Sequence, residues 1–434
     1  MSRLCGLLMS ADAGYRTSIV TTMLHALQPQ TGRQTGQKIA GNAVFGWTGR
    51  HMPNSAAVSG TMVVVDGHIY NIAELEIAGA DASCTDAELI AALYDCYGFE
   101  ETVKRINGDF AAALYDAREN VLWLGRDRFG IKPLYYVATP ELFAFASRPR
   151  ALFALQGVTK EVNREFTAIF AASHYRYFDN NPDKSPYRDI KQVPAAHMLK
   201  IKNSQVLKSK YWHMHDLPDF NLPEKELSEQ YRELLINAVT LRMLAAREPA
   251  FTLSGGMDSS SVLACSVDAV HKKQHAFSTV YTDRTYDESD DIKSMLDSKV
   301  EQWHQVRVDN PNVLETVRRM IAVHDEPVAT ATWLSHYLLC EKVAQGGFKS
   351  LFGGLGGDEL NAGEYEYFFY HFADLKKISN NGQLDHEITM WARYHDHPIY
   401  KKNHVVAQSA LQKLTDPCRP GICLPDQYRM TRYV

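Results

Sequence analysis

The stretch T-L-S-G-G-M-D-S-S-S, residues 252–261, places two glycines, four serines and one carboxylate between an apolar run and a helical pattern. A glycine-rich turn from a strand into a helix gathers backbone N–H groups at the positive end of the helix dipole, where phosphate binds well. Gly255 and Gly256 let the backbone approach such a ligand closely. The carboxylate of Asp258 fits the loop if a divalent cation joins it to the phosphates.

Helix capping is the alternative use for these residue types. Serine and aspartate cap helices in many proteins, so S-G-G alone would indicate no more than an N-cap. The complete S-G-G-x-D-S-S pattern at a strand-to-helix junction favours a phosphate site. Its hydroxyl donors are Ser254, Ser259 and Ser260.

Alternating strands and helices are expected around this loop. An amphipathic helix over 226–244 precedes the apolar strand at 249–253, and helical spacing resumes after the loop. Strands and helices then continue to alternate, with strands at 275–281, 304–308 and 350–354 and helices at 287–298 and 313–323. This alternation predicts a parallel sheet with helices on both faces.

Before about residue 200, short alternating segments predict an α+β unit with much antiparallel sheet. Residues 61–71 are expected to form a hairpin that turns at Asp66-Gly67, because this dipeptide accepts positive φ. A helix over 86–98 is expected to end at Gly98. Further strands are expected at 110–116, 121–127, 133–137 and 142–147.

Composition narrows the class of partners. A net charge of -5 over 434 residues provides no basic field, so neither nucleic acid nor membrane is expected as a partner. Seven scattered cysteines predict free thiols in a reducing compartment rather than a disulfide framework. Because no signal peptide and no run of 18 apolar residues is found, a cytoplasmic location is expected.

Several motifs resemble one known family. The S-G-G-x-D-S-S loop resembles the pyrophosphate loop (PP-loop) of the N-type ATP pyrophosphatases, and G-L-G-G-D-E-L at 354–360 resembles the second signature of the asparagine synthetase family. D-G-H-I-Y-N, G-D-F-A-A-A-L-Y-D and L-G-R-D-R-F-G-I-K-P-L-Y-Y resemble that family's amino-terminal glutamine amidotransferase domain. The motifs follow the family's order and cover approximately residues 1–370.

The resemblance implies two domains. An α+β N-terminal-nucleophile (Ntn) amidotransferase-like domain would span residues 1–205, and an α/β Rossmann-like PP-loop synthetase domain would span 226–434, with a linker over 206–225. Relatives usually continue further, whereas this sequence has 76 residues (434 minus 358) after Asp358. The second domain is therefore expected to be shortened or completed by a partner subunit.

The resemblance also implies ATP and Mg2+ as ligands of the second domain. Asp258 and Asp358 would hold Mg2+, and Leu253 and Thr279 would line the adenine and ribose site. The remaining ATP and pyrophosphate contacts would come from Ser254, Gly255, Gly256, Ser259, Ser260, Gly353 and Gly354. D-E-S-D-D (287–291) and H-D-E-P (324–327) align with segments near the family's substrate pocket, although exposed acids at helix starts explain them equally well.

The amidotransferase half departs from the family's chemistry. Cys5 does not directly follow the initiator Met, so unless four residues are removed it lacks the α-amine that would act as its base. A buried structural thiol is the favoured alternative. Asp66 stands where the family has an asparagine that stabilises the oxyanion, and a carboxylate would repel that charge. The positions that match glutamine-binding residues are Arg50, Gly67 and Asp86.

Three functions remain open at this point. The leading hypothesis is an AMP-forming ligase of the asparagine synthase (glutamine-hydrolysing) type, which takes nitrogen from glutamine or ammonia. The second is a glutamine-independent synthetase that closes an amide on an internal amine of a small-molecule or peptide carboxylate, as in β-lactam synthetases and lasso-peptide cyclases. The third is a catalytically silent binding or regulatory homologue. For each of the three, the protein partner considered is a second copy in a homodimer or a complementing subunit.

Overall fold

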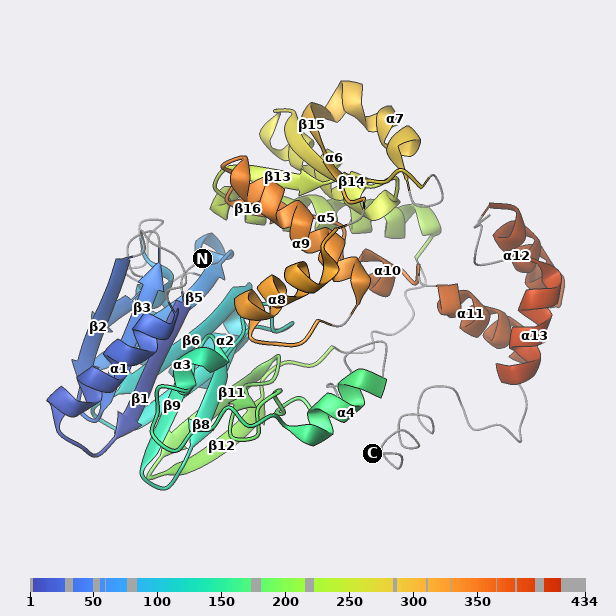
Figure 1. Ribbon diagram of the computed structural model, residues 1–434. Coiled ribbons are helices and arrows are strands. Elements are labelled where there is room, and N and C mark those ends of the chain that lie inside the picture. Colours follow the sequence, from blue (N-terminus) through green and yellow to red (C-terminus); the bar gives the residue numbers. More distant parts are fainter. Residues whose placement is uncertain are drawn as a thin grey trace. The chain divides into compact units, whose positions relative to one another are not determined.

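The computed structural model separates into two compact units (Figure 1). Unit 1 comprises Met1–Pro223 together with Leu314–Thr330, and unit 2 comprises Glu224–Val313 together with Ala331–Val434. The structure describes residues 3–27, 34–49, 55–58, 60–75, 84–172, 181–214, 222–283, 287–309, 311–328, 330–363, 365–378, 381–394 and 402–414.

Two antiparallel sheets form the centre of unit 1. The first has the order β10-β8-β9-β1-β3-β2 and consists of β1 (Arg3–Met9), β2 (Gln34–Ala40), β3 (Ala43–Gly49), β8 (Tyr135–Ala138), β9 (Leu142–Ala146) and β10 (Lys191–Gln192). The second has the order β12-β11-β7-β6-β5-β4 and consists of β4 (Ser55–Val58), β5 (Thr61–Ile69), β6 (Gly108–Asp116), β7 (Val121–Arg126), β11 (His197–Lys202) and β12 (Gln205–Lys210).

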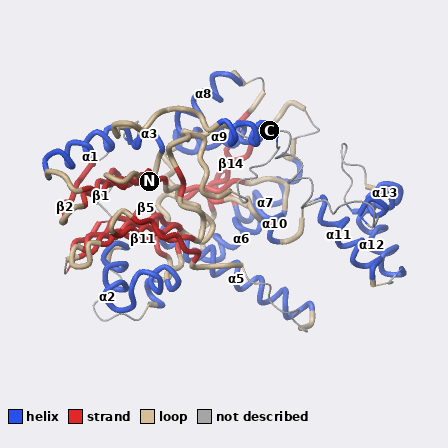
Figure 2. The backbone as a smooth tube through the Cα atoms, turned by 90° about the horizontal axis from the view of Figure 1, so that it is seen from below, coloured by secondary structure: helices blue, strands red, loops and turns tan. Residues whose placement is uncertain are grey.

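Helices cover the outer faces of both sheets, so that unit 1 has four layers (Figure 2). The first sheet is covered by α1 (Ala13–Leu27) and α3 (Pro149–Leu152), and the second by α2 (Asp86–Arg105). Unit 1 also contains the short helices η1 (Ile72–Glu74) and α4 (Arg164–Ala172). This architecture agrees with the predicted Ntn-amidotransferase-like class.

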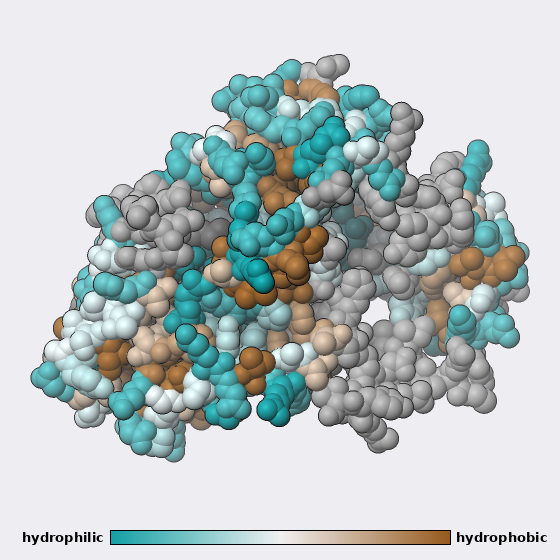
Figure 3. Space-filling model, in the orientation of Figure 1, coloured by the Kyte–Doolittle hydropathy of each residue, from teal (hydrophilic) through white to brown (hydrophobic). Residues whose placement is uncertain are grey.

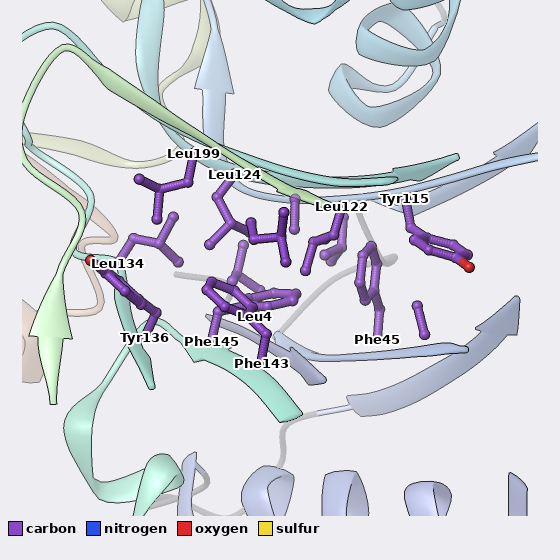
Figure 4. Close-up of a cluster of buried hydrophobic side chains, with 14 of the residues drawn as sticks. Leu4, Phe45, Tyr115, Leu122, Leu124, Leu134, Tyr136, Phe143, Phe145 and Leu199 are labelled. Carbon is purple, nitrogen blue, oxygen red and sulfur yellow. The ribbon is translucent and has the colours of Figure 1, made fainter. Parts of the chain in front are cut away.

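The side chains of β1 alternate between two apolar cores, as in any strand buried on both faces. Leu4 points between the two sheets, where it packs with Phe45 and Phe145, whose rings meet edge to face with centroids 5.2 Å apart (Figure 4). Cys5 points the other way, into the core beneath α1 and α3. The register of β1 therefore decides the surroundings of the Cys5 thiol.

The predicted hairpin turn at Asp66-Gly67 is wrong, because β5 continues through both residues to Ile69. Gly67 pairs with Phe110 on β6 at a φ of 140°, and a Cβ atom there would lie 1.9 Å from the carbonyl oxygen of Asp109. Glycine is needed for this close approach of two strands rather than for a turn. The hairpin that contains β5 instead joins it to β4 near Gly60, whose φ is 88°.

The helix predicted to end at Gly98 is interrupted there, since Gly98 has φ 76° and ψ 168°, and then continues to Arg105. The predicted linker also differs from the structure. Residues 205–210 form β12 on the edge of the second sheet, and α5 begins at Glu224. This mostly exposed strand pairs antiparallel with β11 over six residues.

Unit 2 contains the predicted parallel sheet, in the order β15-β14-β13-β16. Its strands are β13 (Pro249–Thr252), β14 (Gln274–Val280), β15 (Val300–Arg307) and β16 (Ser350–Phe352). Its helices next to the sheet are α5 (Glu224–Ala245), α6 (Met257–Val270), α7 (Ser289–Lys299) and α9 (Ala331–Gln345). Both α6 and α7 pack on one face, and α9 packs on β14 and β15 (Figure 1).

A separate helical core follows in the sequence. It consists of α11 (Tyr365–Lys377), α12 (Asn381–Tyr394) and α13 (His404–Leu414), which pack around the buried Phe372 and Trp391. Most aromatic side chains of α11 therefore belong to this core. Within the described parts of the chain, no helix is both long enough and apolar enough to cross a bilayer.

Candidate active site

The predicted phosphate loop leaves β13 and enters α6, as expected. Leu253 is buried and donates its N–H to the carbonyl oxygen of Phe277 at 2.9 Å, which ties the start of the loop to β14. Ser254 donates its N–H to Oγ of Ser259 at 3.0 Å, and the two hydroxyl oxygens lie 2.8 Å apart. Gly255 and Gly256 are exposed. Hydrogen bonds to β14 and α6 thus hold the loop, while its glycines face solvent.

A carboxylate already binds one backbone amide of this loop. The N–H of Gly255 donates to Oε2 of Glu288 at 2.8 Å, and a Cβ atom on Gly255 would lie 2.8 Å from Cβ of Asp291. An exposed N–H that binds a carboxylate oxygen has the direction needed to bind a phosphate oxygen. Sequence reasoning placed Glu288 only in a segment near the substrate pocket and missed this contact, which depends on the packing of α7.

The second acidic motif lies beside the loop because β16 and β13 are parallel neighbours in the sheet. After β16 the chain passes Gly353 and Gly354 and enters the short helix α10 (Gly357–Leu360). A Cβ atom on Gly354 would lie 2.5 Å from the backbone nitrogen of Ser259, and one on Gly357 would lie 2.2 Å from Cγ of Asp258. Glycine is therefore what allows the two motifs to touch.

The acidic side chains lie close enough together to affect the titration of Asp258. Burial, followed by the charges of Asp358 and Glu359, raises the pKa of Asp258, while a hydrogen bond with Asn361 opposes this shift. Like charges raise a carboxyl pKa only when they are near one another. Asn361 was not singled out from the sequence, although it lies one turn after Asp358 at the end of α10.

The donor set suits Mg2+. Among the residues that the structure describes, no group of three or more His, Cys, Asp or Glu side chains is arranged to hold a metal by itself. Mg2+ is usually bound by one or two carboxylates together with the phosphates of the substrate, so such a group is not needed. The mutual repulsion around Asp258 would be relieved by a cation between it and Asp358.

The other predicted nucleotide contacts lie at the same edge of the sheet. Thr279 is the second-to-last residue of β14, and Leu253 directly follows the last residue of β13. The two strands are parallel neighbours, so both residues lie at the same edge. In α/β sheets, ligands bind beyond the carboxyl ends of the strands. Leu355, in the second motif, is 87% exposed and is therefore not needed for packing.

The Cys5 thiol has surroundings unlike those of a nucleophile. It is completely buried among apolar side chains, including Val20 and Leu24 of α1 and Ala146 of β9, and burial raises its pKa. Arg3 and Leu4 precede it within β1, paired with β3. Nucleophilic cysteines are partly exposed and have lowered pKa values, so the structure matches the buried structural thiol.

A buried polar network occupies the end of β5 where the family's oxyanion residue would stand. The hydroxyl of Ser147 donates to Oδ2 of Asp66 at 3.0 Å and accepts the N–H of Leu4 at 2.9 Å. Nζ of Lys132 lies 3.6 Å from the other carboxylate oxygen. Asp66 is thus compensated by a hydroxyl and a lysine, and it links the two sheets instead of presenting an amide donor.

Two of the three predicted glutamine-binding residues, Gly67 and Asp86, lie in the described part of unit 1, at the end of β5. Asp86 accepts the N–H of Ile69 at 3.0 Å and lies 3.5 Å from Nδ1 of His68, so it supports the end of β5. Gly67 serves the contact between β5 and β6. Arg50 lies outside the described residues.

Comparisons with known proteins agree with these two halves. The family model for the glutamine amidotransferase domain matches residues 15–212, a range that begins after Cys5, and the model for asparagine synthase matches residues 230–418. A putative glutamine-hydrolysing asparagine synthetase 2 of Methanocaldococcus jannaschii is 30% identical over 312 residues, which cover 70% of this chain and 58% of that protein.

Asparagine synthetase (glutamine-hydrolysing) 2 of Bacillus subtilis is 28% identical over 328 residues, which cover 70% of this chain and 42% of that protein. The chain thus spans about half the length of these curated relatives. A solved glutamine phosphoribosylpyrophosphate amidotransferase of B. subtilis covers 81% of this chain and 90% of its own at 12% identity, but its TM-score of 0.34 is too low to support an argument.

Proposed function

Because the chain belongs to the asparagine synthetase family, we propose that it is an ATP-dependent ligase that forms a carbon–nitrogen bond. A carboxylate of a small molecule or peptide attacks the α-phosphorus of ATP, so that pyrophosphate leaves and an acyl-adenylate forms. An amine then attacks the acyl carbon, forms the amide and releases AMP.

One observation carries this proposal: the Asp258 loop and the Asp358 helix touch at the carboxyl edge of the sheet. The two carboxylates would hold Mg2+, which when bound would neutralise charge on the phosphates. The N–H groups of Gly255 and Gly256 and the hydroxyl of Ser254 would hold the pyrophosphate. Such a site acts by positioning the reactants and by stabilising negative charge.

Glu288 has a defined part in this binding step. Its carboxylate accepts the N–H of Gly255, so the incoming phosphate oxygen replaces a carboxylate oxygen on the same donor. A bound ATP would therefore release Glu288 from the loop. The released carboxylate stays within reach of the loop because it directly precedes α7.

A second candidate, a synthetase that does not hydrolyse glutamine, is favoured by two observations in unit 1. The Cys5 thiol is buried in an apolar core, and the Asp66 carboxylate is held by Ser147 and Lys132. Neither arrangement offers a nucleophile or an oxyanion donor to glutamine. In this version the nitrogen comes from ammonia or from an amine of the substrate itself.

Exchange of labelled pyrophosphate into ATP across a panel of carboxylates tests the proposal. Asp258→Ala should abolish the exchange while the protein stays folded, because the loop would lose its cation ligand. Asp268→Ala is the matched control, since Asp268 lies on the same helix but pairs with Lys299 at 2.7 Å on the surface. Exchange by Asp258→Ala at the parent rate would refute the assignment.

Running the same assay to amide product, with glutamine, with ammonium and with neither, separates the nitrogen sources. Product formed only with glutamine would favour the glutamine-hydrolysing version. Product formed with ammonium or without any added donor would favour the second candidate.

A further inference from the structure

Residues 314–330, here called the strap, connect two parts of unit 2 but belong to unit 1. The strap contains most of α8 (Val313–His324) and the H-D-E-P motif at 324–327. In the chain it follows β15 and leads into α9, and both of those elements are part of unit 2. The amidotransferase-like fold thus holds a piece of the synthetase sequence.

The strap is held in unit 1 mainly by contacts of Asp325, which is only 8% exposed. Nε of Arg150, on α3, lies 2.8 Å from Oδ1 and 2.9 Å from Oδ2 of this carboxylate, and Nη2 donates to Oδ1 and to the carbonyl oxygen of Ala322. The hydroxyl of Tyr187 donates to the backbone carbonyl of Asp325 at 2.9 Å. Charge-assisted arginine–carboxylate contacts of this kind are strong and fix orientation.

The neighbouring residue is held as well. The hydroxyl of Tyr135, on β8, donates to Oε1 of Glu326. Tyr135 is buried, and the side chain of Arg150 is about one-quarter exposed, so the residues that hold the strap are themselves packed into unit 1. The H-D-E-P acids therefore are not the exposed helix-start acids that the sequence allowed.

Apolar packing contributes little to holding α8. The helix buries Thr316 and Met320, whereas Leu314, Ile321 and Val323 are 73%, 42% and 42% exposed. Brown, apolar surface is visible where α8 lies in Figure 1 (Figure 3). Because buried apolar area is small, the polar contacts of Asp325 and Glu326 determine where the strap sits.

Backbone geometry makes Asp325 the point at which the chain turns. Its φ is 61°, and its N–H donates to the carbonyl oxygen of Ile321 at 2.8 Å, so it ends α8 in the left-handed conformation. Aspartate and asparagine accept this conformation better than most residues do. One residue thus both turns the chain and provides the carboxylate for Arg150.

We propose that Arg150 is a positioning residue for the synthetase reaction: by gripping Asp325 it anchors the strap, and through it the start of α9 at Ala331. This inference rests on the proposed function. It assigns the amidotransferase-like fold a scaffolding role that needs neither Cys5 nor glutamine. The effect of Arg150 would reach the nucleotide site through α9. This helix packs on β14, the strand that carries Thr279.

Arg150→Gln and Asp325→Asn are two conservative variants that test the contact between these residues. Asn has nearly the shape of the Asp325 side chain and also accepts the left-handed backbone conformation. Hydrogen exchange of the amides of α8 should become about tenfold faster or more in each, because a charged hydrogen-bond partner is lost. The kcat of pyrophosphate exchange should fall at least about tenfold, while the dissociation constant of a non-hydrolysable ATP analogue stays within about twofold.

Arg188→Gln is the matched control, because Arg188 is an exposed arginine of the same unit that pairs with Glu161 and Asp189 on the surface. It should change neither readout. The double variant Arg150→Gln/Asp325→Asn should lose less than the sum of the two single effects, since both single variants remove the contact between Arg150 and Asp325. If Arg150→Gln does not fold, Tyr187→Phe removes only the hydroxyl bond to Asp325 and should show a smaller change of the same kind.

If hydrogen exchange of the α8 amides is unchanged in both single variants, the contact between Arg150 and Asp325 does not hold the strap. If hydrogen exchange of α8 changes but the kcat of pyrophosphate exchange does not, Arg150 is not a positioning residue for the reaction. A parent protein that exchanges no pyrophosphate would refute the proposed function, and the positioning role with it, whereas the hydrogen-exchange result still decides whether the grip exists.

Discussion

Replacing Gly357 by alanine would place a methyl group against the carboxylate of Asp258. The ideal Cβ position lies 2.2 Å from Cγ, 2.3 Å from Oδ2 and 2.7 Å from Oδ1 of that side chain. Non-bonded carbon atoms prefer a separation of about 3.5–4.0 Å, so the carboxylate must move by about 1 Å or more. Because the contact is with a side chain rather than with backbone, this displacement is how the clash would be relieved.

A displacement of that size has a large expected effect on rate. Misplacing a catalytic group by about 1 Å can cost about 100-fold, which corresponds to about 2.7 kcal/mol in the activation free energy. Folding should be affected much less. Gly357 opens α10 without a positive φ, and alanine is the better helix former by about 1 kcal/mol.

The assay is pyrophosphate exchange, with kcat/KM measured beside a thermal unfolding curve. Gly382→Ala is the matched control, because Gly382 lies in α12 and a Cβ atom there would meet no heavy atom within 4 Å. A kcat/KM for Gly357→Ala within threefold of the parent, with unfolding unchanged, would show that the position of the Asp258 carboxylate does not matter to the reaction.

Two further predictions concern titration and the buried thiol. Because burial and the charges of Asp358 and Glu359 raise the pKa of Asp258, the ionised carboxylate is lost at a higher pH than for an ordinary aspartate, and exchange should fall accordingly on acidification. Glu359→Gln removes one like charge, lowers that pKa and should move the acidic limb of the pH–rate profile to lower pH; movement to higher pH would contradict the arrangement. Cys5→Ala should leave ammonium-dependent amide formation unchanged, and in the native protein a thiol reagent should label the exposed Cys96 but not Cys5, as read by peptide mass spectrometry. Labelling of Cys5 at the same rate as Cys96 would contradict its burial.

Local patterns in the sequence were sufficient for much of the fold. The alternation of helix and strand around residues 226–354 predicted the parallel sheet of unit 2, and S-G-G-x-D-S-S predicted a loop between β13 and α6. Both inferences concern residues within a few positions of each other. Side-chain periodicity and turn chemistry act over that range, which is why they can be read without coordinates.

Asp66-Gly67 shows where local reasoning failed. The dipeptide has turn chemistry, yet Gly67 is needed because β6 approaches it closely. The partner strand lies about forty residues away in the sequence, so no feature of the dipeptide itself distinguishes the two uses of glycine. The same holds for Cys5, whose surroundings follow from which face of β1 is covered by α1.

By itself the sequence determined most of the elements, the glycine-rich loop, the acidic motif and the family to which they belong. Only the tertiary structure decided how closely the motifs of Asp258 and Asp358 approach each other, that Lys132 lies 3.6 Å from the Asp66 carboxylate, and that Arg150 holds Asp325. Each of these pairs joins residues far apart in the chain. Such contacts depend on strand order, register and packing, which arise from the whole chain burying its apolar surface at once rather than from any local stretch.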